Sequence, residues 1–326
     1  MNSKKVIIDC GKFATKGIVL NKDGQIALKS NGEPNRVYFQ TKIDKTPSPS
    51  DDKELCPNVE YKGIKYIVGD GDNNNTTDKG TETHKICLLT AISKLVDNGT
   101  EVDLTYGCPA SIFLNPAMLK ELADNLILKD GKDIKIKVND KDHHFKIRNL
   151  KFLPEGLGII YTNPSYKKGY TLVIDIGGWN TNIVLFKNGN PVRKATTTLN
   201  NGGYQLIEII KKGFSQSGKN LGDIFGDDYI LQGIIAGDIL TNSGKSYIPN
   251  GKDIIKKSKN TIIDKIYTEV QRIDESLFEL CSNIIFTGGT SEVLKEEILE
   301  RFPFASIAEN ATWVNVEGFA KCMTET

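Results

Sequence analysis

The sequence predicts an α/β protein that consists of two domains of similar design. Residues 6–20 resemble residues 172–186, because in each segment an apolar strand ends in an aspartate, a glycine follows two positions later, and a second apolar strand comes after the turn. Helix and strand patterns alternate along much of the remaining chain. A chain of 326 residues has room for two domains of roughly 100 to 200 residues each. A repeat at this spacing therefore indicates a duplicated domain core.

The first half of the chain begins with the hairpin at 6–20. A polar, turn-rich stretch at about 31–83 follows, and we expect it to form a small subdomain. Further along we expect a helix over 84–98, a strand over 102–109, a helix over 116–126 and a hairpin over 133–152. The helix boundaries come from Gly99, which suits a helix end, and from Asn115-Pro116, which suits a helix start.

The second half repeats this scheme from the hairpin at 171–186. It continues with a helix over 204–212, a variable stretch at about 213–257, a long helix over 262–277, a strand over 284–287 and a helix over 291–300. The last segment is too short for a domain of its own. We therefore expect a first domain of residues 1–168 with 305–326 returning to it, and a second domain of residues 169–304.

Composition excludes several classes of protein. Lysine and arginine number 42 against 41 aspartates and glutamates, so the net charge of +1 does not indicate direct binding to nucleic acid. The sequence has no apolar run long enough to span a membrane and no apolar leader, so we expect a cytoplasmic protein that contacts no membrane. The six cysteines lack metal-ligand spacing and are expected to be small buried side chains.

The two aspartates at the hairpin tips are candidate metal ligands. An ionised carboxylate at the end of a buried strand is costly unless a cation compensates it. Asp9 and Asp175 are therefore expected to hold hydrated magnesium.

Glycines next to these aspartates indicate phosphate binding. Gly11, Gly177 and Gly178 have no Cβ, so backbone N–H groups there can approach phosphate oxygens closely. Lys16 returns along the second strand toward the same phosphates. A third turn of this kind, Gly288-Gly289-Thr290, follows a buried strand.

A single acid, Glu155, lies where an apolar strand passes into the apolar stretch 157–161. If that stretch is helical, the carboxylate lies at a helix start, where it can either orient a water molecule or simply cap the helix. The residues alone leave both interpretations open.

In this order the motifs resemble those of the superfamily of actin, sugar kinases and DnaK-type chaperones. Its phosphate 1 motif is similar to Asp9–Lys16, its phosphate 2 motif to Asp175–Asn182, and its adenosine motif to Phe286–Thr290. Within the superfamily the chain resembles the ParM-type bacterial actins, which segregate plasmids, and Leu153-Pro154-Glu155 is part of that resemblance. The resemblance implies the actin-like ATPase fold, with two duplicated ribonuclease-H-like domains and a nucleotide in the cleft between them.

The resemblance also implies roles for particular residues. Asp9 and Asp175 would organise magnesium and the phosphates of ATP or GTP, and Glu155 would position the attacking water. The residues implied to bind the nucleotide are Gly11, Lys12, Phe13, Ala14, Thr15, Lys16, Gly177, Gly178, Trp179, Asn180, Gly202, Gly203, Gly288, Gly289 and Thr290. Asn201 would line the nucleoside beside Gly202.

Two departures from the family pattern stand out. Lys12 and Phe13 follow the first glycine, where the family usually has a small hydroxyl residue. Asn180 and Asn182 stand where phosphate 2 usually has a threonine and an aspartate. Because position 182 has no carboxylate, the coordination of metal or water there would differ in detail from the family pattern.

The implied function is a filament-forming NTPase that polymerises with bound nucleotide and segregates plasmid DNA through a centromere-binding adaptor protein. Contact with DNA would then be indirect. A small-molecule kinase on the same fold is the alternative, although no second acid loop for an acceptor hydroxyl is evident. A third possibility is a nucleotide-gated binding module like a chaperone ATPase domain.

Overall fold

The computed structural model describes residues 3–45, 50–73, 78–219, 221, 226–241 and 243–325. The chain divides into two compact units, the first comprising residues 1–167 with 313–326 and the second residues 168–312. The predicted variable stretches, 31–83 and 213–257, lie partly outside the described residues, at 46–49, 74–77, 220, 222–225 and 242. None of the helices in the described part of the chain is long and apolar enough to cross a membrane.

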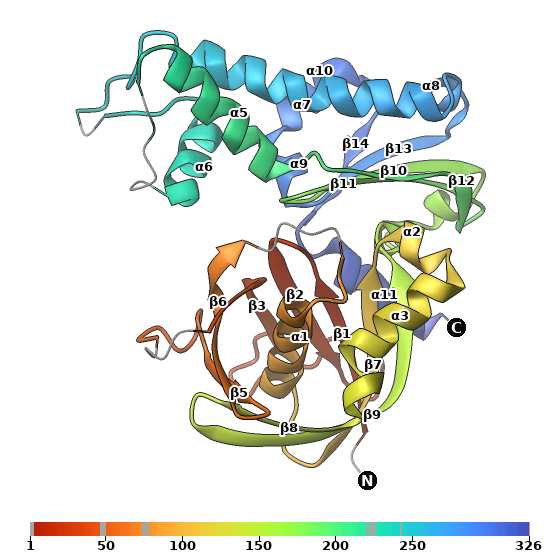
Figure 1. Ribbon diagram of the computed structural model, residues 1–326. Helices are drawn as coiled ribbons and strands as arrows, with labels where there is room; N and C mark the ends of the chain where they lie inside the picture. The colour runs from red at the N-terminus through yellow and green to blue at the C-terminus, as the bar shows by residue number, and fades with distance from the viewer. Residues whose placement is uncertain are drawn as a thin grey trace. The chain divides into compact units, whose positions relative to one another are not determined.

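Unit 1 contains a mixed sheet of nine strands in the order β3-β2-β1-β7-β9-β8-β5-β6-β4 (Figure 1). The strands are β1 (Ser3–Cys10), β2 (Ala14–Leu20), β3 (Arg36–Gln40), β4 (Lys42–Asp44), β5 (Asn58–Tyr61), β6 (Ile64–Asn73), β7 (Thr100–Cys108), β8 (Asp133–Val138) and β9 (Lys141–Pro154). β1, β7 and β9 run parallel, and antiparallel strands extend the sheet on both sides. The parallel centre of the sheet is consistent with the buried apolar run Val6-Ile7-Ile8 of β1.

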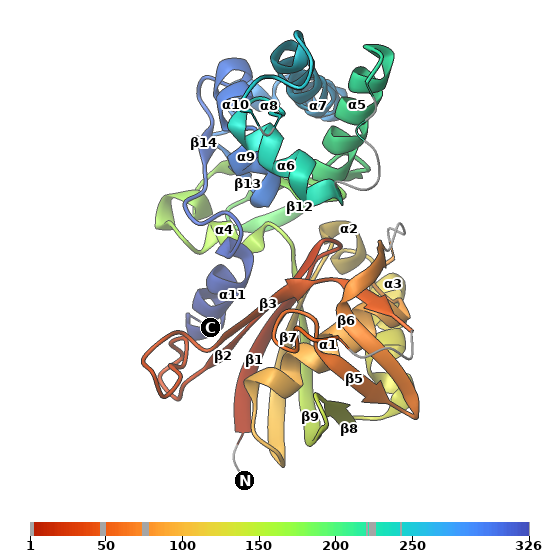
Figure 2. The same ribbon diagram turned by 90° about the vertical axis from the view of Figure 1, so that its left-hand side faces the viewer.

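Helices cover both faces of this sheet. The helices of unit 1 are α1 (Glu82–Leu95), α2 (Ala110–Phe113), α3 (Pro116–Leu126), α4 (Leu157–Ile160) and α11 (Val314–Thr324), with short 3-10 turns at Leu128–Asp130 and Pro164–Lys167. Figure 2 shows α1 and α11 on opposite sides of the β1–β3 part of the sheet. The predicted start of α3 is confirmed, because Asn115 Oδ1 accepts a hydrogen bond from Ala117 N at 3.2 Å and Pro116 occupies the first turn.

Unit 2 contains a second, smaller sheet with the strand order β12-β11-β10-β13-β14. Its elements are β10 (Tyr170–Ile176), β11 (Thr181–Lys187), β12 (Asn190–Leu199), α5 (Gly203–Gln216), α6 (Gly226–Ala236), α7 (Gly251–Ile273), α8 (Leu277–Leu280), β13 (Asn283–Thr287), α9 (Gly289–Val293), α10 (Lys295–Arg301) and β14 (Ser306–Ile307). The repeat seen in the sequence is thus the same β-hairpin in both sheets, β1–β2 and β10–β11, each with a parallel strand beside its first strand.

Several element boundaries differ from the sequence-based ones. α7 begins at Gly251, well before the predicted residue 262, because its first turns are polar and carry little apolar periodicity. The predicted helix over 291–300 is two short helices that meet at Leu294. Residues 305–312 group with unit 2, because β14 pairs with β13, and the chain groups with unit 1 from Trp313.

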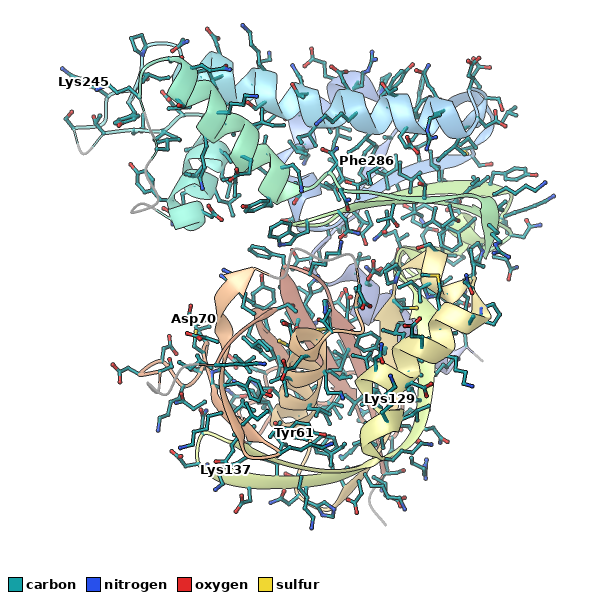
Figure 3. The ribbon with its side chains drawn as sticks, viewed as in Figure 1. Tyr61, Asp70, Lys129, Lys137, Lys245 and Phe286 are labelled. Carbon is teal, nitrogen blue, oxygen red and sulfur yellow. The ribbon has the colours of Figure 1, made fainter. Side chains whose placement is uncertain are left out.

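Each unit has its own hydrophobic core. In unit 1 the core lies around the sheet and α1, and in unit 2 it lies between the sheet and α5, α7 and α10. Figure 3 shows Phe286, which is fully buried, inside unit 2, whereas Lys129 and Lys245 are exposed. The two cores contain no shared residue among those described, as expected for duplicated domains.

Two helices of unit 1 cross at a pair of glycines. A Cβ on Gly318 of α11 would lie 2.0 Å from the carbonyl oxygen of Gly158 in α4, and a Cβ on Gly158 would lie 2.6 Å from the Cα of Asn315. These distances are far shorter than ordinary carbon contacts, so only glycine fits at either position. The crossing holds α11 beside the end of β9.

We expect Gly318→Ala to destabilise the protein by about 1–3 kcal/mol or more, because the added methyl group has no space and the two helices must separate. Chemical denaturation of the purified variant measures this. Lys321→Ala on the exposed side of the same helix is the matched control and should change stability little. A variant with alanine at 318 that is as stable as the wild type would contradict the close crossing.

Candidate functional site

The hairpin β1–β2 places an acid and a base directly opposite each other. Asp9 and Lys16 are partners in the antiparallel register, and Lys16 Nζ lies 3.8 Å from Asp9 Oδ2. The turn is closed by a hydrogen bond from Gly11 N to Ala14 O at 3.0 Å. The position of Lys16 beside the tip aspartate is therefore a consequence of strand register.

The remaining residues of this turn have different surroundings. Phe13 lies at the tip with 38% of its surface exposed, whereas Ala14 and Thr15 are buried. The Thr15 hydroxyl lies 3.0 Å from Cys10 Sγ and 2.9 Å from Thr41 Oγ1. Because these contacts hold the Thr15 side chain inside unit 1, Thr15 stabilises the turn from its buried side.

Glu155 and Asp9 share a buried lysine that no sequence motif indicated. Lys79 is 2% exposed, its Nζ forms an ion pair with Glu155 Oε1, and the same Nζ lies 3.7 Å from Asp9 Oδ1. Burial by itself lowers the pKa of Lys79, but the two carboxylates outweigh burial and hold it above its ordinary value. The lysine therefore remains charged.

Lys12 adds a further cation near this pair. It is 8% exposed, and its pKa lies below the ordinary value because of burial and of the nearby charge on Lys79, which Glu155 partly offsets. Lys12, Lys16 and Lys79 together exceed the two acids Asp9 and Glu155 by one positive charge. An excess of positive charge beside backbone amides favours an anion such as a phosphate.

The backbone around Glu155 is held from two directions. Glu155 N donates to Cys108 O at 2.8 Å, which continues the pairing of β9 with β7. Gly156 N donates to Asn315 Oδ1 of α11 at 3.1 Å, and Gly156 has a positive φ of 82°. Glu155 thus precedes α4 at a turn that the C-terminal helix stabilises, and 94% of its surface is buried.

In unit 2 three predicted segments converge on one carbonyl group. Gly177 O accepts hydrogen bonds from Gly203 N at 3.1 Å and from Thr290 Oγ1 at 2.9 Å. A Cβ on Gly202 would lie 2.6 Å from the same oxygen. The structure therefore brings the turn at Gly177-Gly178, the start of α5 and the start of α9 together.

Asp175 lies next to the third glycine turn. A Cβ on Gly288 would lie 2.4 Å from Asp175 Oδ1, and Gly288 has a φ of +87°. Both observations require glycine there, since a side chain would collide with the carboxylate and strain the backbone. Asp175 itself is 8% exposed.

The two asparagines that depart from the family pattern belong to a polar network. Asn182 lies opposite Asp175 in the β10–β11 register, and its Oδ1 accepts hydrogen bonds from Thr198 Oγ1 at 2.8 Å and from Asn180 Nδ2 at 3.3 Å. Trp179 stacks on Tyr204 with ring centroids 3.9 Å apart. Asn180 and Asn182 therefore stabilise the hairpin.

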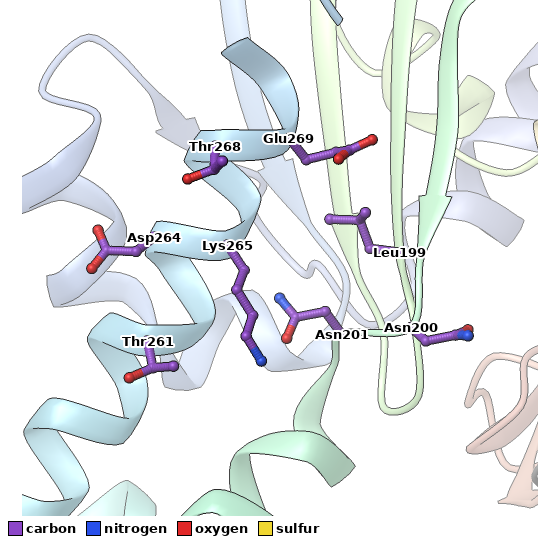
Figure 4. Close-up of a pocket in the computed structure, with 8 residues that line it drawn as sticks. All are labelled: Leu199, Asn200, Asn201, Thr261, Asp264, Lys265, Thr268 and Glu269. Atoms are coloured by element: carbon purple, nitrogen blue, oxygen red, sulfur yellow. The ribbon is translucent and has the colours of Figure 1, made fainter. Parts of the chain in front are cut away.

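A hollow of about 550 Å³ lies elsewhere in unit 2, between α7 and the residues after β12 (Figure 4). Its lining consists of Leu199, Asn200, Asn201, Thr261, Asp264, Lys265, Thr268 and Glu269. Of the residues implied to contact the nucleotide, only Asn201 belongs to it. Asn201 Nδ2 donates to Ile262 O at 3.1 Å, which joins α7 to the start of α5.

The described residues contain no group of three histidine, cysteine, aspartate or glutamate side chains able to hold a metal ion. Asp9 Oδ1 is buried and makes no hydrogen bond with the described residues, but Lys79 and Lys16 lie within 4 Å of the carboxylate. Magnesium usually keeps several of its waters and binds one or two carboxylates. Two lysines already compensate the Asp9 carboxylate, so direct coordination of magnesium in a protein cage does not fit, and magnesium would have to bind there through its waters.

Each half of the chain matches a known protein family. Residues 8–158 match the family "Actin like proteins N terminal domain", and residues 173–300 match "Archaeal actin homologue MreB-like, C-terminal". The chain belongs to the actin-like proteins. No curated protein sequence matches it.

Solved structures of actin-like proteins share the fold along the whole chain. A non-polymerisable quadruple mutant of pCBH ParM has a TM-score of 0.75 at 21% identity, with 100% of both chains covered. The archaeal actin homologue Ta0583 in complex with ADP gives 0.75 at 16%, and a 15-stranded ParM filament from Clostridium botulinum gives 0.73 at 20%, each with 100% of both chains covered. The fold class predicted from the sequence is confirmed.

Sequence reasoning missed three residues of the unit 1 site in this actin-like protein. Lys79 lies in a polar stretch rich in asparagine and threonine, and Asn315 lies far from Glu155 along the chain. His84, in the first turns of α1, is fully buried. The only local signal was Thr81, a helix N-cap that marks where α1 begins and so fixes the region of Lys79 and His84.

His84 should make the stability of the protein depend on pH. Burial, together with the positive charges of Lys79 and Lys12, lowers the pKa of His84 to about 3 from an ordinary 6.5. Between these two pH values the unfolded chain binds a proton that the folded chain does not, so the contribution of His84 to stability falls by about 1.4 kcal/mol for each unit that pH decreases.

We therefore expect His84→Gln to reduce the loss of stability between pH 6.5 and pH 3, measured by denaturation at a series of pH values. His143→Gln is the matched control, since His143 is on a partly exposed hairpin, and it should retain most of the wild-type dependence. Equal pH dependence in wild type and His84→Gln would contradict a neutral buried His84.

Proposed function

We propose that this chain is a filament-forming actin-like NTPase that binds ATP or GTP with magnesium, polymerises with the nucleotide bound, and hydrolyses it. The observation that carries the proposal is the arrangement of Glu155 and Asp9 around buried Lys79, beside Lys12 and Lys16. It combines a carboxylate able to orient water with cations able to hold phosphates.

Each residue set has a role in this proposal. Lys12, Lys16 and the N–H groups that follow Gly11 in the turn bind phosphate oxygens, and Glu155 accepts a hydrogen bond from the attacking water. Gly177, Gly178, Gly202 and Gly203 bind the nucleotide through unit 2, because glycine has no Cβ that would keep a ligand away from the backbone. Magnesium, held by Asp9 and Asp175 through its waters, would neutralise part of the phosphate charge.

The cellular role that we propose is segregation of plasmid DNA. Two similar structures support the nucleotide-dependent assembly on which this role depends: one is a 15-stranded ParM filament, and another is an archaeal actin homologue in complex with ADP. Nucleotide-dependent assembly would move DNA through a centromere-binding adaptor, in keeping with a net charge of +1 that does not favour direct binding to DNA. We expect such a filament to act in the cytoplasm.

Light scattering and electron microscopy of the purified protein with magnesium and ATP or GTP test the proposal. We expect filaments with nucleotide and none without it. Glu155→Gln should assemble normally but release phosphate roughly 10²-fold more slowly or worse, because the general base is lost. Glu121→Gln, an exposed glutamate of unit 1, is the control and should behave as the wild type. The proposal fails if nucleotide causes no assembly at tens of micromolar protein.

Replacement of either tip aspartate should weaken magnesium-dependent turnover. We expect Asp9→Ala and Asp175→Ala each to lower phosphate release about 10-fold or more and to raise the magnesium concentration needed for half the maximal rate. Magnesium titrations of steady-state phosphate release measure both effects. Asp142→Ala, at the exposed start of β9, is the control. Indifference at either tip would exclude that aspartate from metal binding.

A further inference from the structure

Lys79 is buried to an extent that is rare for lysine. Its side chain is 2% exposed, and its Nζ lies between carboxylate oxygens from two different strand ends, those of β1 and β9. Removal of an ammonium group from water costs several kcal/mol, which only close and well-placed partners offset. A buried lysine therefore needs a close partner of opposite charge. For Lys79 this partner is the carboxylate of Glu155, to which we assign the activation of water.

Lys79 lies closer to Glu155 than to Asp9. Lys79 Nζ is in hydrogen-bond contact with Glu155 Oε1, whereas Asp9 Oδ1 lies 3.7 Å away, beyond a direct hydrogen bond. Asp9 has a second cation, Lys16, at 3.8 Å. Glu155 is therefore the principal partner of Lys79, and Asp9 contributes through its charge.

The backbone of Glu155 is already fixed by Cys108 O and by Asn315 through Gly156. Backbone bonds leave the rotatable bonds of the glutamate side chain undetermined, and a carboxylate that activates water must be held within a narrow range of directions. Lys79 supplies a contact at the far end of the side chain. Lys79 is itself located by the start of α1, where Thr81 is the N-cap and accepts a hydrogen bond from His84 N at 3.4 Å.

Lys16 and Lys79 differ in burial, and this difference indicates different roles. Lys16 has 17% of its side chain exposed and pairs loosely with Asp9, so it can turn toward a phosphate at small cost. Lys79 would have to leave a buried hydrogen-bonded partner, which is far more costly. This difference favours a structural task for Lys79 and a ligand-binding task for Lys16.

We propose that Lys79 is a positioning residue, which holds the Glu155 carboxylate in the orientation that activates water for nucleotide hydrolysis. The inference rests on the proposed function, since it assigns Lys79 a role in the same reaction. Lys79 acts through Glu155, and it need not touch the nucleotide.

Four variants test this: Lys79→Met, Lys79→Arg, Glu155→Gln, and Lys79→Met combined with Glu155→Gln. Steady-state phosphate release gives kcat and KM for each, and titration with a fluorescent ATP analogue gives nucleotide affinity. We expect Lys79→Met to lower kcat about 10- to 100-fold with affinity little changed, because orientation is lost and the phosphate-binding cations remain. Lys79→Arg should recover part of kcat, since arginine keeps the charge and donors.

The double variant gives the sharpest result. If Lys79 acts only through Glu155, its removal should add almost nothing to the loss that Glu155→Gln already causes. Lys120→Met, an exposed lysine of α3, is the control for loss of a lysine in unit 1. If Lys79→Met does not fold, as judged by its thermal unfolding, Lys79→Gln takes its place in the same set.

The inference is overturned if the lysine variant keeps the wild-type kcat or exceeds it, if nucleotide affinity falls as much as kcat, or if the two losses multiply in the double variant. A wild-type protein without any nucleotide hydrolysis is a different outcome, because it removes the proposed function itself. An active wild type with an inactive Glu155→Gln and an unimpaired Lys79→Met removes only the role of Lys79.

Discussion

The buried carboxylate of Glu155 needs a cation beside it, and much of unit 1 is arranged around that requirement. The segment just before α1 brings Lys79 to the end of β9. Asp9, near the end of β1, lies close to the same ammonium group. The C-terminal helix α11 holds the turn after Glu155 through Asn315. Because buried charges tolerate little displacement, these elements have to keep their mutual positions for unit 1 to remain stable.

Unit 2 uses backbone groups where unit 1 uses charges. The Gly177 carbonyl accepts from the backbone N–H of Gly203 and from the Thr290 hydroxyl, so the segments that meet there do so without a charged pair. The same difference appears within the repeated hairpin. Lys16 lies opposite Asp9, whereas Asn182 lies opposite Asp175. The strand register is thus the same in the two hairpins, whereas the chemistry at their tips differs, and the tip in unit 1 carries a lysine where the tip in unit 2 carries an asparagine.

The sequence predicted the parts of this protein that depend on local patterns. Apolar runs and turn residues located the two repeated hairpins and the strands β7, β8, β9 and β13, and Asn115-Pro116 marked the start of α3, because these features act over a few neighbouring residues. The start of α7 was placed too late because its first turns carry few apolar residues. Residues 305–312 were expected in the first domain, since nothing in their sequence indicates that the two-residue strand β14 pairs with β13.

The sequence by itself determined the duplicated α/β fold of an actin-like protein and the identity of the acids and glycines at its turns. Local spacing is enough for these, because a strand followed by an acid and a glycine needs no distant partner to be recognised. Only the tertiary structure decided that Lys79 lies between Asp9 and Glu155, that Asn315 holds Gly156, and that Gly318 crosses Gly158. Each of these contacts joins residues that are at least 70 positions apart, and no pattern along the chain encodes which distant side chain compensates a buried charge.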